Sequence, residues 1–464
     1  MGLDPGRAAR RPAPHFGVDG GWHDGIVAAA TVNMSPIGNR LHAAVLSIAL
    51  LGVFLCHGAP GTADGANDPG SSAGAIVAHL QYREVDFAPL CREINVTRST
   101  RFTREPAFVG PQIFRGRFVL DNDNNQYLPF AWDIRERKLY VDLNHNGDLT
   151  DDPAGVLTAS GQDLQLFRGL RLRFGSEGGH YDVLVDAHVF EQGDTARVFL
   201  YVRSLWEGAV ELGGKQWYLA VVDRPDGRIG PTASMKKIAN RMILRPWADR
   251  DQQFLWWHAS LRHVHDLSHV KLVDFPFRYA GNAEVFDAFN VPASLFLEGQ
   301  AYQVEYHVES GGNLAVTFRA FQPPRGKLHL GSEYLRRVVL DGGSAGFTVV
   351  LDSPPAEVEV PTGVYPRQIF LLQRAGFTNV AAGLGTNLLT VTESNLAALN
   401  VGAPLLNAVR ILPEPASGTV SLNYQLTNLA GMSFRLAFQD EKTSPRLEIR
   451  QGDRQVAQGR FNFG

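Results

Sequence analysis

Oxygen-bearing side chains recur at alternate positions between Asp142 and Asp152, a pattern typical of a calcium-binding loop. A hard divalent cation takes about six to eight oxygen ligands at about 2.3–2.6 Å, and a curled loop can supply them from every second residue. Gly147 stands at the sixth position, where an EF-hand loop needs a residue that tolerates a positive φ. With structural Ca²⁺ as the expected cofactor, the predicted ligands are Asp142, Asn144, Asn146, Asp148, Thr150 and Asp152.

Two features separate this loop from a true EF-hand. Pro153 occupies the twelfth position, where an EF-hand carries a bidentate Glu, so Asp151 or Asp152 would have to serve. The preceding residues Lys138–Val141 favour a strand rather than a helix. We therefore expect a structural calcium site of the strand–loop type. The alternative is an Asx-rich surface turn that binds no metal.

Two other stretches carry similar residues with a weaker pattern. Asp121–Asn125 has the oxygen side chains but no Gly, so it either lends ligands to the first loop or forms a plain turn. Asp223–Gly227 looks like a shortened version of the first loop. Its Pro225 and its spacing favour a turn without metal.

A histidine cluster between His258 and His269 is the second candidate site. It contains His258, His263, His265, Asp266 and His269. His265 and His269 share a face on a helix, whereas His263 and His265 share one on a strand. Either pair could hold zinc or copper. The alternative is a polar surface, because no HExxH motif is present.

No other catalytic signature stands out. The two G-x-S-x-G matches, Gly70–Gly74 and Gly342–Gly346, do not lie between a strand and a helix as a nucleophile elbow does, and the chain has no Gly-rich phosphate loop. Trp206, Trp217 and the pair Trp256-Trp257 could form a platform for sugar stacking, but packing in the core is the favoured interpretation.

A thirteen-residue apolar run from Ala43 to Leu55 predicts a secretory signal. The run is too short to span a bilayer, which takes about 20 residues. Arg40 gives the positive flank, and the small residues Gly61 and Ala63 predict cleavage after Ala63. The signal thus lies within 34–63, and the protein is expected to be secreted or periplasmic, with no transmembrane span in the mature chain.

Two details of this leader stay open. Met34 begins a compact signal of its own, so residues 1–33 are predicted to be a disordered upstream extension. Cys56 raises the alternative of a lipoprotein, but the residue before a lipidated Cys is small and Leu55 is large. Cleavage after Ala63 leaves Cys91 as the single thiol, which we expect to be buried.

Composition excludes several function classes. The chain has 464 residues, a net charge of −3 and 2 Cys. This charge provides no overall positive field for nucleic acid, which is therefore not expected as a partner. The low Cys count excludes a disulfide scaffold and a Cys-rich zinc module.

Short runs of β-type residues broken by turns predict a mainly β protein with several β-rich modules. Strict alternation in Leu170–Phe174 and Val420–Leu426 is typical of half-buried strands. Ser234–Val270 is the best helical candidate, broken by Pro246. The expected organisation is a flexible leader (64–74), an N-terminal β-rich domain with the calcium-type loop (75–230), a partly helical insert (231–285), a second β-rich domain (286–400) and an immunoglobulin-like β-sandwich (401–464).

The stretch Tyr140–Asp152 resembles the "YVDxNxNGDLTDD" motif of uncharacterised secreted proteins from planctomycete-type bacteria. Leu212–Tyr218 and Leu297–Tyr302 are similar to the "LGGKxY" strand starts of that group. The C-terminal Gly459–Gly464 is similar to its "GxFxYG" ending, with Phe463 in place of Tyr. The resemblance implies export, β-rich modules and an EF-hand-like loop, and it implies no known reaction.

Two function hypotheses follow. The first is a secreted, calcium-stabilised β-rich binding or structural protein of the cell envelope, with a cell-surface glycan or protein as its partner and no assigned catalysis. The second is a secreted hydrolase, glycan-directed or metal-dependent, that uses the His258–His269 region. Calcium-linked stability without turnover supports the first, whereas a cleft that collects carboxylates or histidines supports the second. The sequence favours the first.

Overall fold

The structure is a computed structural model whose described residues form a mainly β protein. It describes residues 15–18, 27–31, 74–85, 88–98, 101–120, 126–159, 165–176, 179–192, 195–231, 240–250, 283–284, 288–331, 333–343, 346–373, 381–385, 387–401, 404–414, 419–429, 432–436, 446–451 and 453–460. Two short 3₁₀ turns, η1 (Pro153–Gly155) and η2 (Trp247–Asp249), accompany the strands of these ranges. The predicted mainly β class is confirmed.

The larger sheet has sixteen strands, and its neighbours are antiparallel apart from β17 and β22. In spatial order they are β1 (His15–Val18), β29 (Leu405–Glu414), β30 (Thr419–Asn428), β31 (Ser433–Leu436), β26 (Ala381–Gly385), β25 (Arg367–Leu372), β21 (Leu335–Asp341), β22 (Phe347–Asp352), β17 (Ser294–Leu297), β18 (Gln300–Val308), β19 (Leu314–Phe321), β3 (Ile76–Glu84), β12 (Ser204–Leu212), β13 (Lys215–Val222), β14 (Arg241–Pro246) and β16 (Ala288–Asn290).

Two tight hairpins in this sheet follow from local sequence. Gly213 and Gly214 join β12 to β13 with φ of 59° and 70°. Glu298 and Gly299 join β17 to β18 with φ of 50° and 79°. Two residues with positive φ match the right-handed twist of the flanking strands, so these loops fix the register of both pairs.

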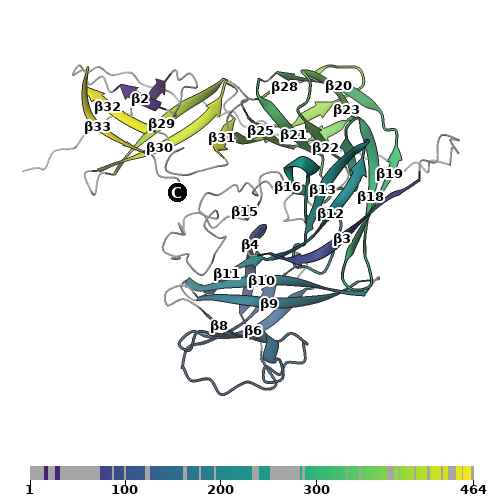
Figure 1. Cartoon of the computed structure of the whole chain (residues 1–464). Helices are drawn as coiled ribbons and strands as arrows, with labels where there is room; N and C mark the ends of the chain where they lie inside the picture. Colours follow the sequence, from purple (N-terminus) through teal and green to yellow (C-terminus); the bar gives the residue numbers. More distant parts are fainter. Residues whose placement is uncertain are drawn as a thin grey trace, which may run out of the picture.

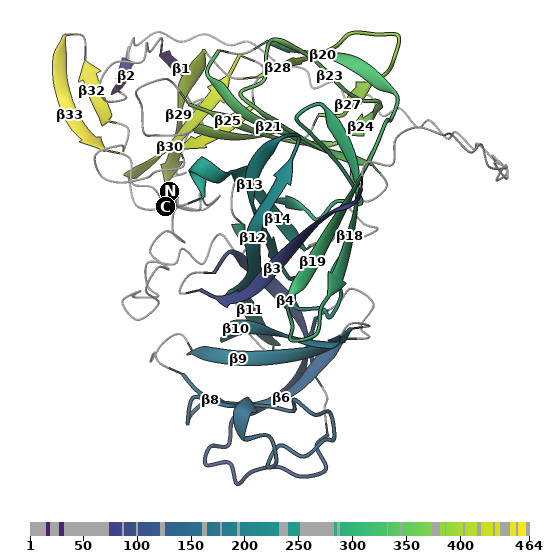
Figure 2. The ribbon, with the colours of Figure 1, turned by 45° about the vertical axis from the view of Figure 1, so that its right-hand side comes forward.

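The smaller sheet has nine antiparallel strands. Its order is β8 (Val156–Thr158), β7 (Lys138–Val141), β6 (Tyr127–Asp133), β5 (Ile113–Val119), β4 (Leu90–Arg98), β11 (Thr195–Val202), β10 (Gly179–Gln192) and β9 (Gln165–Ser176), with β15 (Ala283–Glu284) beside β4. In both views β9, β10 and β11 lie between β6 and β8 on one side and the strands β3, β12 and β13 on the other (Figures 1 and 2).

Two neighbouring segments pass from one sheet into the other at a corner formed by Val85 and Arg203. Val85 lies between β3 and β4, and Arg203 lies between β11 and β12. The Val85 N–H donates to the Arg203 carbonyl at 2.9 Å, and Arg203 Nε donates back to the Val85 carbonyl at 3.1 Å. Arg203 Nη1 also pairs with the fully buried carboxylate of Asp186 at 3.0 Å. The corner therefore couples the two sheets through one side chain.

The part of the larger sheet from β21 to β16 curls back on itself, and we call it the curled sheet. Side chains rather than a strand ladder join its two ends. Arg337 on β21 donates to the Leu244 carbonyl on β14 at 2.7 Å. Asn290 on β16 donates to Asp341 on β21 at 2.9 Å.

One hydrophobic core runs through both sheets. Its largest fully buried side chains include Trp132, Trp206 and Trp217. The indole N–H groups of Trp206 and Trp217 donate to the carbonyls of Gly312 and Leu212. These two residues therefore pack in the core, as the favoured interpretation predicted, and form no sugar platform. Cys91 is buried, as expected, and forms no disulfide within the described residues.

A second core cluster lies around Phe296, Tyr365 and Phe370. Small sheets surround it: β23 (Glu357–Pro361) with β20 (Arg325–Gly331) and β28 (Ala397–Asn400), and β24 (Gly363–Tyr365) with β27 (Leu389–Val391). A further sheet contains β2 (Val27–Thr31), β32 (Arg446–Gln451) and β33 (Arg454–Arg460).

The helical prediction for Ser234–Val270 is wrong where the structure describes it. Arg241–Pro246 is strand β14, which pairs with β13 on one side and β16 on the other. The residues from Arg241 to Arg245 are all buried. A strand covered on both faces reads as a continuous apolar run, which periodicity does not separate from a buried helix. Residues 251–282 lie outside the described ranges.

Strand pairing connects regions that the sequence analysis separated. Strand β3 of the 75–230 region pairs with β19 of the 286–400 region, with Leu80 opposite Leu314. The region 1–33, predicted to be disordered, contributes β1 and β2, which pair with β29 and β32. Of the 401–464 region, β29, β30 and β31 belong to the larger sheet. The immunoglobulin-like sandwich stays a prediction.

Replacing Arg203 with Met should lower the free energy of unfolding by about 3–5 kcal/mol, because it leaves the buried Asp186 carboxylate without its charged partner. Equilibrium unfolding in urea measures this loss. Arg173→Met, which removes an exposed ion pair with Asp182, is the control and should leave the midpoint nearly unchanged. Equal losses of unfolding free energy in the two variants would show that the Arg203–Asp186 pair stabilises the protein no more than an exposed ion pair does.

Candidate metal centre

The predicted calcium-type loop leaves β7 and ends at η1, at the edge of the smaller sheet. Strand β7 pairs with β6 and β8, so the predicted strand before the loop is confirmed. The backbone turns sharply at His145 and Gly147, whose φ values are 60° and 81°. A positive φ is accessible to Gly without the clash that a Cβ introduces. Gly147 thus closes the turn that the sequence pattern required.

Asp142 is the buried end of the loop, with 1% of its surface exposed. Its Oδ2 accepts the Gly147 N–H at 3.0 Å, which ties the first loop position to the sixth. Its Oδ1 is buried and has no hydrogen-bond partner among the described residues. A buried carboxylate oxygen without a partner is costly, and a bound cation is one way to satisfy it.

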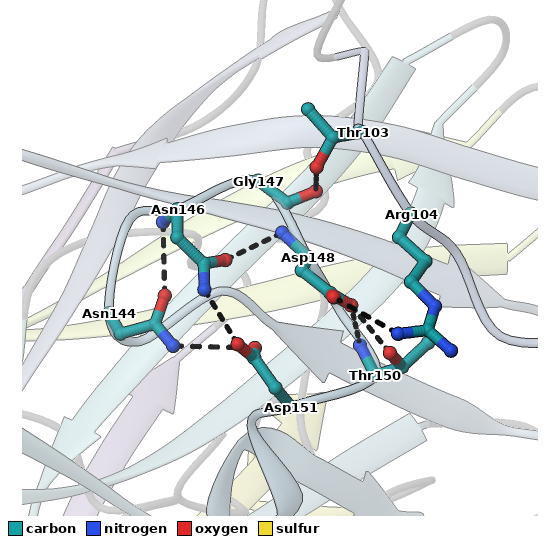
Figure 3. A network of polar contacts seen from close by, with 8 residues as sticks. All are labelled: Thr103, Arg104, Asn144, Asn146, Gly147, Asp148, Thr150 and Asp151. Carbon is teal, nitrogen blue, oxygen red and sulfur yellow. Dashed lines mark hydrogen bonds and ion pairs between the residues drawn. The ribbon is translucent and has the colours of Figure 1, made fainter.

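The middle of the loop is a series of Asx turns (Figure 3). Asn144 Oδ1 accepts the Asn146 N–H at 3.0 Å, and Asn146 Oδ1 accepts the Asp148 N–H at 2.7 Å. Asp148 Oδ1 accepts the Thr150 N–H at 2.8 Å and the Thr150 hydroxyl at 2.5 Å. Each amide oxygen retains a second lone pair that a cation could use.

Asp151 and Asp152 close the loop in different ways. The Nδ2 groups of Asn144 and Asn146 donate to the Asp151 carboxylate at 3.3 and 2.6 Å. Asp152 Oδ2 accepts the Leu143 N–H at 3.0 Å. Burial, reinforced by the negative charges of Asp142 and Asp151, raises the pKa of Asp152. Asp151, which the sequence analysis placed only as an alternative to Asp152, is therefore part of the cluster.

Thr103 and Arg104 hold the loop from outside, and sequence reasoning missed both. Thr103 donates its N–H and its hydroxyl to the Gly147 carbonyl at 2.8 and 3.0 Å. The Leu149 N–H donates to the Arg104 carbonyl at 3.0 Å. The Arg104 guanidinium lies 3.7 Å from Asp148 Oδ2. No sequence signal marks these residues, because they lie about forty positions upstream and contribute mainly backbone groups.

Asp148 is the predicted ligand whose carboxylate is most engaged by protein groups. The Thr150 hydroxyl and N–H, followed by the Arg104 charge, lower its pKa. Both of its oxygens therefore face protein partners. The Asp148 side chain contributes negative charge to the loop, while its place in a metal shell stays a prediction.

No three His, Cys, Asp or Glu side chains within the described ranges converge closely enough to hold a metal ion by themselves. Three of the six predicted ligands are Asn144, Asn146 and Thr150. A cation at this loop would therefore use amide and hydroxyl oxygens beside the carboxylates. Such oxygen ligands suit Ca²⁺ or Mg²⁺ rather than zinc or copper.

The other candidate stretches have different outcomes. Asp223–Gly227 is a turn, as favoured: Asp226 Oδ1 accepts the Arg228 N–H at 3.2 Å, and Gly227 has a φ of 78°. Asp121–Asn125 lies outside the described residues. The His258–His269 cluster and Trp256-Trp257 also lie outside them, so the metal-binding histidine hypothesis stays a prediction.

The fold and this loop define a mainly β protein with an Asx-rich, oxygen-lined turn. The described part of the chain contains no helix with the length and apolar character of a membrane span. A comparison with protein-family models found no match, and neither did comparisons with curated proteins and with solved structures. The resemblance to secreted planctomycete-type proteins therefore stays a prediction.

Replacing Gly147 with Ala should lower stability by about 1–2 kcal/mol, because a residue with a Cβ is strained at a positive φ. Urea unfolding in excess chelator measures this effect without metal. Gly175→Ala is the control, since Gly175 lies within β9 and a Cβ there meets no atom within 4 Å. If Gly147→Ala is as harmless as the control, the loop does not need its sharp turn.

Proposed function

We propose that this protein is a secreted, calcium-stabilised β-rich binding or structural protein of the cell envelope. The observation that carries the proposal is the buried Oδ1 of Asp142, which has no hydrogen-bond partner among the described residues. This oxygen lies at the start of a loop whose side-chain oxygens recur at every second position. A hard cation would supply the partner that the protein does not.

The charge of the loop supports a cation at this position. Asp142, Asp148, Asp151 and Asp152 lie within eleven residues, while the nearby Arg104 faces only Asp148. Burial is the main cause of the raised pKa of Asp152, and the negative charges of Asp142 and Asp151 add to it. Opposite charge placed among these carboxylates would relieve that repulsion.

A cation in the loop would stabilise more than the loop itself. Thr103 and Arg104 attach the segment before β5 to Gly147 and Leu149. Fixing the loop would therefore also fix this segment on the smaller sheet. For an exported chain with the single thiol Cys91, such a tie provides the stiffening that disulfides give other secreted proteins.

The export and partner parts of the proposal rest on the sequence. The apolar run Ala43–Leu55 with small residues before the predicted cleavage point supports secretion. The net charge of −3 provides no field for nucleic acid. A cell-surface glycan or protein is the partner that such an exported β-rich protein would meet.

Calcium should raise the melting temperature of the exported protein by several degrees relative to excess chelator, because binding to the folded state alone stabilises it. Asp142→Asn should remove most of this rise, since the buried oxygen loses its charge. Calorimetric titration of Ca²⁺ into the chelated protein gives the stoichiometry, which should be one ion per chain.

Asp182→Asn is the matched control, because Asp182 pairs with Arg173 on the smaller sheet and has no contact with the loop. It should retain the full calcium response. An identical melt in calcium and in chelator for the wild-type protein, with no heat on titration, would leave the loop as a plain surface turn.

A further inference from the structure

A second buried carboxylate, Asp223, lies at the junction of the two sheets and takes no part in the calcium-type loop. It directly follows β13 and has 1% of its surface exposed. Neither of its oxygens has a hydrogen-bond partner of ordinary geometry among the described residues. The Tyr181 hydroxyl, the Arg224 N–H and the charges of Arg224 and Arg92 favour the ionised carboxylate, but its burial outweighs them.

The groups around Asp223 come from three elements. Tyr181 at the start of β10 places its buried hydroxyl beside the carboxylate, Arg92 comes from β4, and Arg224 is the next residue of the loop. Arg224 is itself engaged by Asp226 in an ion pair. The positive charge of Arg224 is therefore shared between Asp223 and Asp226. Arg224 and Arg92 together only partly compensate the burial of Asp223.

Tyr181 also connects this cluster to the core. Its ring lies 5.4 Å from that of Trp206 on β12 and 5.5 Å from that of Phe174 on β9. A Cβ on Gly227, in the same loop as Asp223, would lie 3.0 Å from Phe174. The loop that contains Asp223 and Gly227 thus lies beside aromatic side chains of β9, β10 and β12.

We propose that Asp223 is a pH-sensitive latch between the two sheets. As a neutral carboxylic acid it donates its proton to the Tyr181 hydroxyl oxygen and is compatible with its apolar surroundings. When it releases that proton to solvent, the junction must enclose a negative charge that the Tyr181 hydroxyl, now the donor, and the charges of Arg92 and Arg224 offset only in part. The β9–β10 layer is then held less firmly on the curled sheet.

The sign of the pH dependence follows from the direction of the shift. Burial raises the pKa of Asp223 from 3.8 to about 7, while Tyr181, Arg224 and Arg92 act in the opposite direction. The stabilisation is fully present below the unfolded pKa of 3.8 and is lost as the pH rises to about 7. The wild-type protein should therefore be less stable at pH 8 than at pH 5.

Thermal unfolding of the full chain between pH 5 and pH 8, at a fixed excess of chelator, tests the latch. The wild-type melting temperature should fall by roughly 5 °C or more across this range. Asp223→Asn should remove most of the fall. Asp133→Asn is the matched control, because Asp133 is equally buried but accepts hydrogen bonds from Val109 and Glu136. It should keep the wild-type dependence.

Tyr181→Phe provides a second test that does not depend on the folding of Asp223→Asn. The Tyr181 hydroxyl lowers the pKa of Asp223, so its removal should move the midpoint of the fall to higher pH. A purely structural role for Tyr181 would lower stability at every pH without moving the midpoint. An unchanged fall in Asp223→Asn, or an unmoved midpoint in Tyr181→Phe, would overturn the proposal.

Discussion

The ion pair between Arg203 and Asp186 holds the corner at which two neighbouring strands leave one sheet and enter the other. Arg203 bonds to the Val85 carbonyl as well, so a single guanidinium serves both chain segments and the buried carboxylate. Asp186 lies at a bulge in β10, where the pairing with β9 shifts register, and it also accepts the Gly169 N–H. A bulge bends and twists its strand. Asp186, which pairs with Arg203, therefore lies where β10 changes direction relative to β9. The positions of both sheets therefore depend on this contact.

Polar side chains of the same kind close the curled sheet. Arg337 is 4% exposed, and it forms two hydrogen bonds with Asp352 while it reaches across to the Leu244 carbonyl. A buried Arg is tolerated when its planar fork meets a carboxylate and its remaining donors find acceptors. The hydrogen bond from Asn290 on β16 to Asp341 on β21 joins the same two ends of the curled sheet. Hydrogen bonds from Arg337 and Asn290, rather than a continuous strand ladder, therefore join the two ends of the curled sheet.

Buried carboxylates in this protein thus have three different environments. Asp186 pairs with Arg203 and contributes to the fold. Asp142 has one oxygen without a partner among the described residues, in a loop rich in further oxygens, which favours a cation. Asp223 is enclosed beside the Tyr181 hydroxyl, and burial outweighs the nearby positive charges, which favours a proton. Burial imposes the same requirement on each group, and the neighbouring atoms decide which partner meets it.

The sequence by itself determined the features that depend on short spacing. The alternating oxygens from Asp142 onward, the strand Lys138–Val141 before them and the turn at Gly147 were readable because hydrogen bonds and φ restrictions act over a few residues. It could not show that β14 is a strand, because a segment buried on both faces loses its periodicity. Only the tertiary structure shows that β3 pairs with β19, that Thr103 donates hydrogen bonds to the Gly147 carbonyl and that the Asp223 side chain is buried. These contacts join residues far apart in the chain, and they form because whole apolar faces must be covered together, a requirement that no local pattern encodes.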